Sequence, residues 1–163
     1  MIVVSNTSPL ISLAHIGLFN LLASLYSALL VPQAVWDEIV VSGANLPGAQ
    51  ELRGASWVTM VAVQNQPLVQ ALRQELDAGE AEAIALTLEA NADLLIMDER
   101  LGRETARHLG LRYTGTIGVL VDAKSSGLIE LIRPHLDALR QQAGFWIHDN
   151  LYQRVLIDAG ETA

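Results

Sequence analysis

Four polar side chains are spaced in this sequence so that one metal ion could bind to all of them: Asn6, Glu38, Glu80 and Asp98. Asn6 and Asp98 each follow a short apolar run, at residues 2–4 and 94–97, that is typical of a buried strand. If these strands are neighbours, about 4.8 Å apart, the residues after them converge at the sheet edge where open α/β sheets bind ligands. Glu38 and Glu80 lie on predicted helices that could bring two more acids to that edge.

Carboxylate and amide oxygens are ligands that suit Mg²⁺ or Mn²⁺, ions that also retain several waters. Gathered carboxylates repel one another unless a cation offsets their charge. A bound ion can activate water and neutralise the charge that develops on a phosphodiester. The four residues therefore predict a site for a divalent metal, with Asn6 as its neutral member.

Most of these residues also have a structural explanation. Asn6 could cap the helix that follows it, although Thr7 or Ser8 could take that role instead. Glu38 follows another acid and could simply be solvated on a helix surface. Asp98 stands before a predicted helix and could be its N-cap.

Glu80 has a more specific competing role, because it lies three residues after Asp77, which is the spacing of a capping box. Glu82 is a substitute ligand, but it points roughly 200° away from Glu80 around a helix. Glu80 shares its face with the apolar Ile84 and Leu88. We therefore expect Glu80 to point toward the sheet.

Short apolar strands alternate with helices along the chain. Strands are predicted at residues 2–4, 28–31, 57–63, 94–97 and 111–113, and helices at 10–14, 18–25, 33–41, 67–76, 80–90, 99–109 and 116–123. This alternation predicts an α/β fold, a three-layer α/β/α sandwich with a central parallel sheet. Residues 1–125 would form this domain, and residues 126–163 a C-terminal helical extension packed on it, with helices at 128–139 and 146–157.

Composition narrows the class of protein. The 163 residues suit one domain, and 51% hydrophobic residues with only 5% aromatics predict an aliphatic core. The absence of cysteine excludes disulfides and thiolate sites and fits a cytoplasmic protein. A net charge of −8 argues against a broad basic surface, although metal-binding carboxylates contribute to that charge. We expect neither a signal peptide nor a membrane span, since no apolar run approaches roughly 20 residues.

The order of the motifs resembles the PIN-domain family, metal-dependent ribonucleases that include VapC-type toxins of toxin–antitoxin pairs. The opening IVVSNTSPLISLAHIG is similar to the family's first strand and loop, VPQAVWDEI to its second acidic motif, and LDAGEAEAIALTLEANADLLIMDER to the third and fourth joined. The greatest similarity is to a branch with Gly-Glu-Ala-Glu-Ala-Ile and a later Gly-Thr-x-Gly, which occurs here at Gly115, Thr116 and Gly118. The resemblance covers about the first 125 residues.

The resemblance implies a cytoplasmic endoribonuclease dependent on Mg²⁺ or Mn²⁺, with a homodimeric state and an antitoxin protein as a possible partner. The catalytic and metal-binding residues would be Asn6, Glu38, Glu80 and Asp98. The family pattern has Asp where this chain has Asn6, and an amide brings no negative charge. One unit charge acting on a dication at a few Å is worth several kcal/mol at an effective dielectric near 20, before desolvation. The alternative is therefore a weakened or inactive module that binds RNA or a partner protein.

The residues expected to contact RNA are Thr7, Ser8, Arg100, Arg103 and Thr116. Arg100 and Arg103 follow Asp98 at helical spacing and could hold phosphates beside the metal. They could equally form a solvated face paired with Glu99 and Glu104. Glu99 itself is either a supporting acid of the site or a partner for Arg103.

Overall fold

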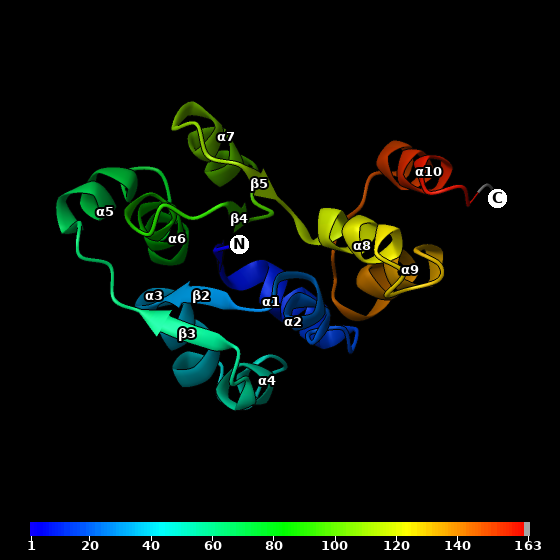
Figure 1. The fold of residues 1–163 in the computed structure, drawn as a ribbon, viewed down its shortest axis with the longest axis horizontal. Helices are drawn as coiled ribbons and strands as arrows, with labels where there is room; N and C mark the ends of the chain where they lie inside the picture. The colour runs from blue at the N-terminus through cyan, green and yellow to red at the C-terminus, as the bar shows by residue number, and fades with distance from the viewer. Residues whose placement is uncertain (162–163) are drawn as a thin grey trace.

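The computed structural model describes residues 1–161 and places five parallel strands in one sheet, in the order β3-β2-β1-β4-β5 (Figure 1). Central β1 pairs with β4 so that Ser5 lies opposite Ile96. The strands are β1 (Val3–Ser5), β2 (Leu29–Pro32), β3 (Val58–Val61), β4 (Leu94–Ile96) and β5 (Tyr113–Thr114). The predicted α/β/α sandwich with a central parallel sheet is confirmed.

Alternate strand residues enter two hydrophobic cores, one on each face of the sheet. Val3 and Ile96 lie in the larger core, whereas Val4, Leu95 and Met97 lie in the smaller one, as the two-residue period of a strand requires. The larger core contains α1 (Thr7–His15), α2 (Leu21–Tyr26), α8 (Thr116–Ser125), α9 (Arg133–Gln142) and α10 (Asp149–Asp158). The smaller core contains α5 (Gln66–Leu72), α6 (Ala78–Glu89) and α7 (Arg100–His108). In Figure 1, α5 and α6 lie on one side of the strands, and α8, α9 and α10 lie on the other.

The chain order reverses between β1 and β4. From β1 the chain builds outward to β2 and β3, and it then returns to the other side of β1 to add β4 and β5. The helices that follow these two strands, α1 and α7, consequently pack into opposite cores. Such a reversal leaves a crevice at the carboxyl ends of the two strands, which is the usual ligand site of an open α/β sheet. Asn6 and Asp98 lie at this reversal.

The segment between β2 and β3 differs from the sequence prediction. The helix expected over residues 33–41 divides into a short α3 (Gln33–Trp36) and a π-helical segment, η1 (Asp37–Ser42). An additional helix, α4 (Ala49–Gly54), follows the turn at residues 43–48. It is only six residues long and buries only Ala49 and Leu52, so it lacks the repeated apolar stripe that identifies a helix in a sequence.

The C-terminal helices begin later than predicted. Residues 128–132 are not helical, and α9 starts at Arg133 with Pro134 in its first turn, where a missing N–H costs little. Residues 146–148 precede α10, because His148 is its N-cap and Nδ1 of that ring accepts a hydrogen bond from the backbone N–H of Asn150. Thr162 and Ala163, the end of the predicted extension, lie outside the described residues.

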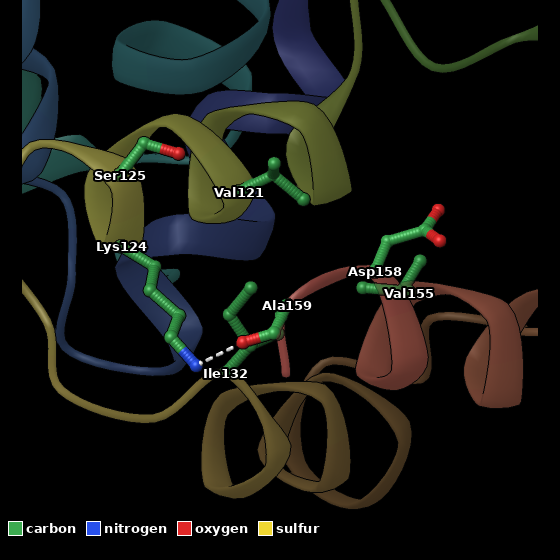
Figure 2. Close-up of a pocket in the computed structure, with 7 residues that line it drawn as sticks. All are labelled: Val121, Lys124, Ser125, Ile132, Val155, Asp158 and Ala159. Atoms are coloured by element: carbon green, nitrogen blue, oxygen red, sulfur yellow. Dashed lines mark hydrogen bonds between the residues drawn. The ribbon is translucent and has the colours of Figure 1, made fainter. Parts of the chain in front are cut away.

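Both C-terminal helices bury apolar side chains in the larger core, among them Leu136, Leu139 and Leu156. Nζ of Lys124 on α8 donates to the carbonyl of Ala159 (2.7 Å) at the rim of a cavity between α8 and α10 (Figure 2). The division of the chain near residue 125 stays a prediction. No helix within residues 1–161 has the length and apolar character needed to cross a membrane.

Candidate active site

Asn6 is buried directly after β1, with 2% of its surface exposed. Its backbone N–H donates to the carbonyl of Ile96, and its Nδ2 donates to Oε2 of Glu99 (2.9 Å). Because a carboxylate only accepts hydrogen bonds, Nδ2 must face Glu99 and Oδ1 must point the other way. That Oδ1 is buried and has no hydrogen-bond partner among the described residues, 1–161. Asn6 occupies the N-cap position of α1 without making a capping bond, so capping does not explain it.

Glu99 connects the two loops that meet at the crevice. Besides the amide of Asn6, it accepts a hydrogen bond from Oγ of Ser8. It forms no ion pair with Arg103 in the part of the chain that the structure describes, so of its two predicted roles the supporting one agrees with its contacts. The sequence could not identify the partners of Glu99, because Asn6 and Ser8 lie over 90 residues away in the chain.

Asp98 follows β4 and is held at the start of α8. Both of its carboxylate oxygens accept hydrogen bonds from Thr116, Oδ1 from the backbone N–H (2.7 Å) and Oδ2 from Oγ1 (2.6 Å). Gly115 leaves the space that this contact needs, since a Cβ there would lie 2.6 Å from Oδ1. Burial raises the pKa of Asp98 despite these hydrogen bonds, and the nearby charge of Glu99 raises it further. A cation beside Asp98 would relieve both effects.

Glu38 lies on η1, where its Oε2 accepts a hydrogen bond from Oγ1 of Thr7 (2.9 Å). The first turn of α6 approaches the same pair at Gly79, where a Cβ would lie 3.4 Å from Oε2 of Glu38 and 3.5 Å from Oγ1 of Thr7. The side chain of Glu38 therefore lies against the starts of α1 and α6, at the same sheet edge as Asn6.

Glu80 makes the predicted capping box: its Oε1 accepts from the backbone N–H of Asp77 (3.0 Å), and Oδ1 of Asp77 accepts from that of Glu80 (2.8 Å). Burial raises the pKa of Glu80, and the charge of Glu99 adds to the increase, so Glu80 lies within the electrostatic reach of the crevice. Glu82 instead accepts from the backbone N–H of Ala34 at the start of α3.

These contacts bring the four predicted residues to one sheet edge. Asn6 contacts Glu99, the residue that follows Asp98, and Thr7 holds Glu38. Glu80 follows Gly79, which lies against Glu38 and Thr7. The four residues are not one coordination sphere, because no three acidic or histidine side chains in residues 1–161 are grouped closely enough to hold an ion. Their role as metal ligands and catalytic residues stays a prediction.

The residues predicted to contact RNA divide into two groups. The hydroxyls of Thr7, Ser8 and Thr116 all donate to carboxylates of the site and so orient them. Arg100 forms an exposed ion pair with Glu104, which fits the solvated alternative. Arg103 lies with its guanidinium 5.0 Å from the centre of the Tyr113 ring, and its buried Nε has no partner.

The fold and the site together define an α/β protein with an acidic crevice at the reversal of a parallel sheet. A family model described as a PIN domain matches residues 2–161, so this chain belongs to the PIN-domain family. The family has a nuclease-type fold, and its members generally use divalent metal ions. No curated protein matches the chain.

Proposed function

We propose that this protein is a metal-dependent endoribonuclease of the PIN type, with a Mg²⁺ or Mn²⁺ site in the crevice between β1 and β4. The observation that carries the proposal is the orientation of Asn6. Its Oδ1 is a buried acceptor without a partner, and leaving such an atom unpaired costs about 1–3 kcal/mol. A cation or a water held by a cation would satisfy it.

The donor set fits a hard dication, because it consists of oxygen atoms only. Asn6 offers its free Oδ1, and Asp98 keeps acceptor capacity beyond its two bonds from Thr116. Glu38 and Glu80 would complete the site from the helix starts. A bound dication supplies an activated water and neutralises charge on the phosphodiester.

The remaining residues of the site position these donors. Thr116 and Gly115 fix the carboxylate of Asp98, and Glu99 fixes the amide of Asn6. Glu99 also supplies a negative charge 2.9 Å from that amide. The charge that an aspartate would bring at position 6 is thus replaced by a neighbouring carboxylate, which favours an active enzyme over a decayed one.

The test is cleavage of RNA by the purified full chain with Mg²⁺ or Mn²⁺, combined with Mn²⁺ calorimetry. We expect Asp98→Asn to lower cleavage more than about a hundredfold, which exceeds the usual loss for a residue that only supports a metal ligand. Asp158→Asn, an exposed acid on α10, is the matched control and should change neither readout. Cleavage that survives EDTA or Asp98→Asn contradicts the proposal.

The second candidate is a non-catalytic PIN module that binds RNA or a partner protein such as an antitoxin. The neutral Asn6 and the spread of the acids within residues 1–161 favour it. RNA binding that needs no metal, together with no RNA cleavage in the presence of Mg²⁺ or Mn²⁺, would support this second candidate. We also propose that the protein is a cytoplasmic homodimer, and sedimentation would test its dimeric state. A toxin role is proposed as well, and growth arrest on expression of the protein would test it.

A further inference from the structure

A cavity of about 330 Å³ opens beside Asp98, between the start of α8 and the loop that precedes α10. Its wall combines the charged Asp98 and Arg103 with the apolar side chains of Phe145, Trp146 and Leu151. Small-molecule sites have volumes of about 300–1,000 Å³ and a similar mixture of apolar walls and few polar groups. The cavity is therefore continuous with the proposed active site and large enough for part of a substrate.

Trp146 is the most exposed large hydrophobic side chain in residues 1–161, with 79% of its surface accessible. Phe145 beside it is half-buried and packs against the larger core. An aromatic ring left in water next to a cavity offers a free face on which a planar group can stack.

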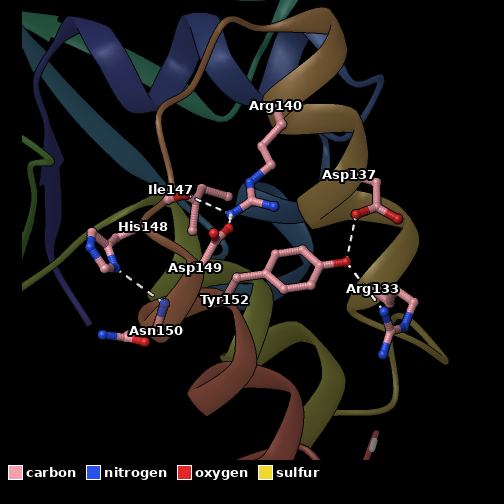
Figure 3. Close-up of polar contacts among 8 residues, drawn as sticks. All are labelled: Arg133, Asp137, Arg140, Ile147, His148, Asp149, Asn150 and Tyr152. Atoms are coloured by element: carbon pink, nitrogen blue, oxygen red, sulfur yellow. Dashed lines mark hydrogen bonds and ion pairs between the residues drawn. The ribbon is translucent and has the colours of Figure 1, made fainter. Parts of the chain in front are cut away.

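The loop that carries these rings is held in place (Figure 3). Nη2 of Arg140 donates to the carbonyl of Ile147 (2.6 Å) and to Oδ1 of Asp149 (3.2 Å), and its guanidinium lies 4.3 Å from the centre of the Tyr152 ring. Tyr152 in turn donates to Asp137 on α9 (2.6 Å). The exposure of Trp146 therefore belongs to an ordered loop, and a pre-organised surface loses less entropy when it binds.

Arg103 contributes a cation to the wall of the cavity. Its guanidinium rests against Tyr113, and its buried Nε–H has no acceptor within residues 1–161. Guanidinium N–H groups bind phosphate oxygens through short, charge-assisted hydrogen bonds. A cation next to stacking surfaces suits a nucleotide better than an apolar peptide, which would leave the charge of Arg103 without a partner.

We propose that this cavity binds the base of an unpaired nucleotide next to the scissile phosphodiester, with Trp146 and Phe145 against the base and Arg103 on a phosphate. The inference rests on the proposed ribonuclease function, since Asp98 belongs to both sites. Proteins read single-stranded RNA by stacking splayed bases on aromatic side chains, whereas bases inside a duplex are not available. The site therefore requires a base that is not paired.

The test measures the fluorescence anisotropy of an end-labelled, unstructured RNA of about ten nucleotides, within the usual site size for such binding, as the protein is added. This readout also gives the affinity of variants that lack Trp146, and tryptophan emission is followed in the wild type alone. EDTA is present, so that neither cleavage nor metal binding contributes. We expect the RNA to quench Trp146 and Trp146→Ala to weaken binding by about 5- to 150-fold, the range found for one stacked base. Trp146→Phe should restore most of the affinity, and a duplex of the same sequence should bind more weakly.

The matched control is Leu46→Ala, which removes an exposed apolar side chain lying outside this cavity and should leave RNA affinity unchanged. Unchanged affinity in Trp146→Ala would overturn the inference, and would point to a partner polypeptide as the occupant of this face. The experiments distinguish failure of the proposed ribonuclease function from failure of the proposed base site. Binding in EDTA without cleavage under any metal would remove only the nuclease, whereas cleavage unaffected by Trp146→Ala would remove only the base site.

Discussion

Asn6 and Glu99 form the contact on which the proposed activity depends most. Their hydrogen bond sets the direction of the amide, because only Nδ2 can donate to the carboxylate. It also keeps a negative charge next to the position where the family pattern has an acid. Residues that orient a metal ligand in this way usually affect metal affinity almost as strongly as the ligand itself.

We therefore predict that Glu99→Gln lowers Mn²⁺ affinity by about 10- to 100-fold. The variant removes the charge and also allows the amide of Asn6 to turn over, since a glutamine can both donate and accept. Calorimetry measures the change, and Glu104→Gln on the same helix is the control. If Glu99→Gln and the wild type bind Mn²⁺ with equal affinity, the charge of Glu99 does not support the metal site and the prediction is wrong.

A second residue-level prediction concerns the space beside Asp98. Gly115→Ala places a Cβ 2.6 Å from Oδ1 of Asp98, so the carboxylate has to move away from Thr116. We expect a loss of about 1–3 kcal/mol in the free energy of unfolding, as for other overpacked sites, together with weaker Mn²⁺ binding. Gly54→Ala is the matched control because nothing lies within 4 Å of its Cβ position. Urea unfolding and calorimetry distinguish the two variants.

Among the helices and strands, the starts of α1, α6 and α8 and the segment η1 bring the side chains of the site together. At each position a hydrogen bond fixes an acid: Thr7 donates to Glu38, the backbone N–H of Asp77 to Glu80, and Thr116 to Asp98. The capping box holds the carboxylate of Glu80, whereas the negative charge of Glu99 repels it and raises its pKa. The capping box and any metal role of Glu80 are therefore coupled.

Asp77→Ala is predicted to destabilise the protein by about 0.5–2 kcal/mol, the usual cost of losing a side-chain N-cap. Asp77→Asn should lose much less, because its amide oxygen can still accept from the backbone N–H of Glu80. Urea denaturation of both variants measures the difference. If they are equally unstable, the charge of Asp77 rather than its hydrogen bond supports α6.

The same elements show what the sequence could and could not predict. Apolar runs identified the central strands β1, β2 and β4, because strands buried on both faces need them. The edge strand β3 is partly exposed and was predicted from a loose alternation over residues 57–63. The ends of the strands also located Asn6 and Asp98, because the residues that follow neighbouring parallel strands lie at one edge of the sheet. The contacts of Glu99 could not be predicted, since they depend on which strands become neighbours, and the cavity beside Trp146 was missed because residues 146–148 continued a helical pattern.

Across the whole molecule, Glu161 adds polar contacts to the apolar ones that attach the C-terminal segment to the domain. Glu161 accepts hydrogen bonds from Nζ of Lys124 (2.7 Å) and from the backbone N–H groups of Ile132 (2.7 Å) and Arg133 (3.0 Å). Burial alone would raise its pKa, but these bonds outweigh burial and lower the pKa of Glu161 to about 2. The contacts of the folded state therefore stabilise the ionised form of the Glu161 carboxylate.

This shift predicts how stability depends on pH. A carboxylate whose folded pKa is about 2, below its ordinary 4.5, stabilises the fold above pH 4.5, and that contribution is lost as pH falls toward 2. The difference in unfolding free energy between wild type and Glu161→Gln should accordingly be largest near neutral pH and shrink through this window. Glu130→Gln, an exposed acid nearby, is the control. A difference that is constant with pH would contradict the assignment.

The distance in sequence between the two halves of the crevice has a consequence for the newly made chain. Asn6 leaves the ribosome early, but Glu99 lies 93 residues further along and Thr116, which holds Asp98, later still. Because contacts of such separation form only after the intervening chain has been synthesised, the growing polypeptide cannot assemble this acidic centre during most of its translation. An enzyme that cuts RNA would thus stay harmless to its own message at least until Thr116 has been added to the chain.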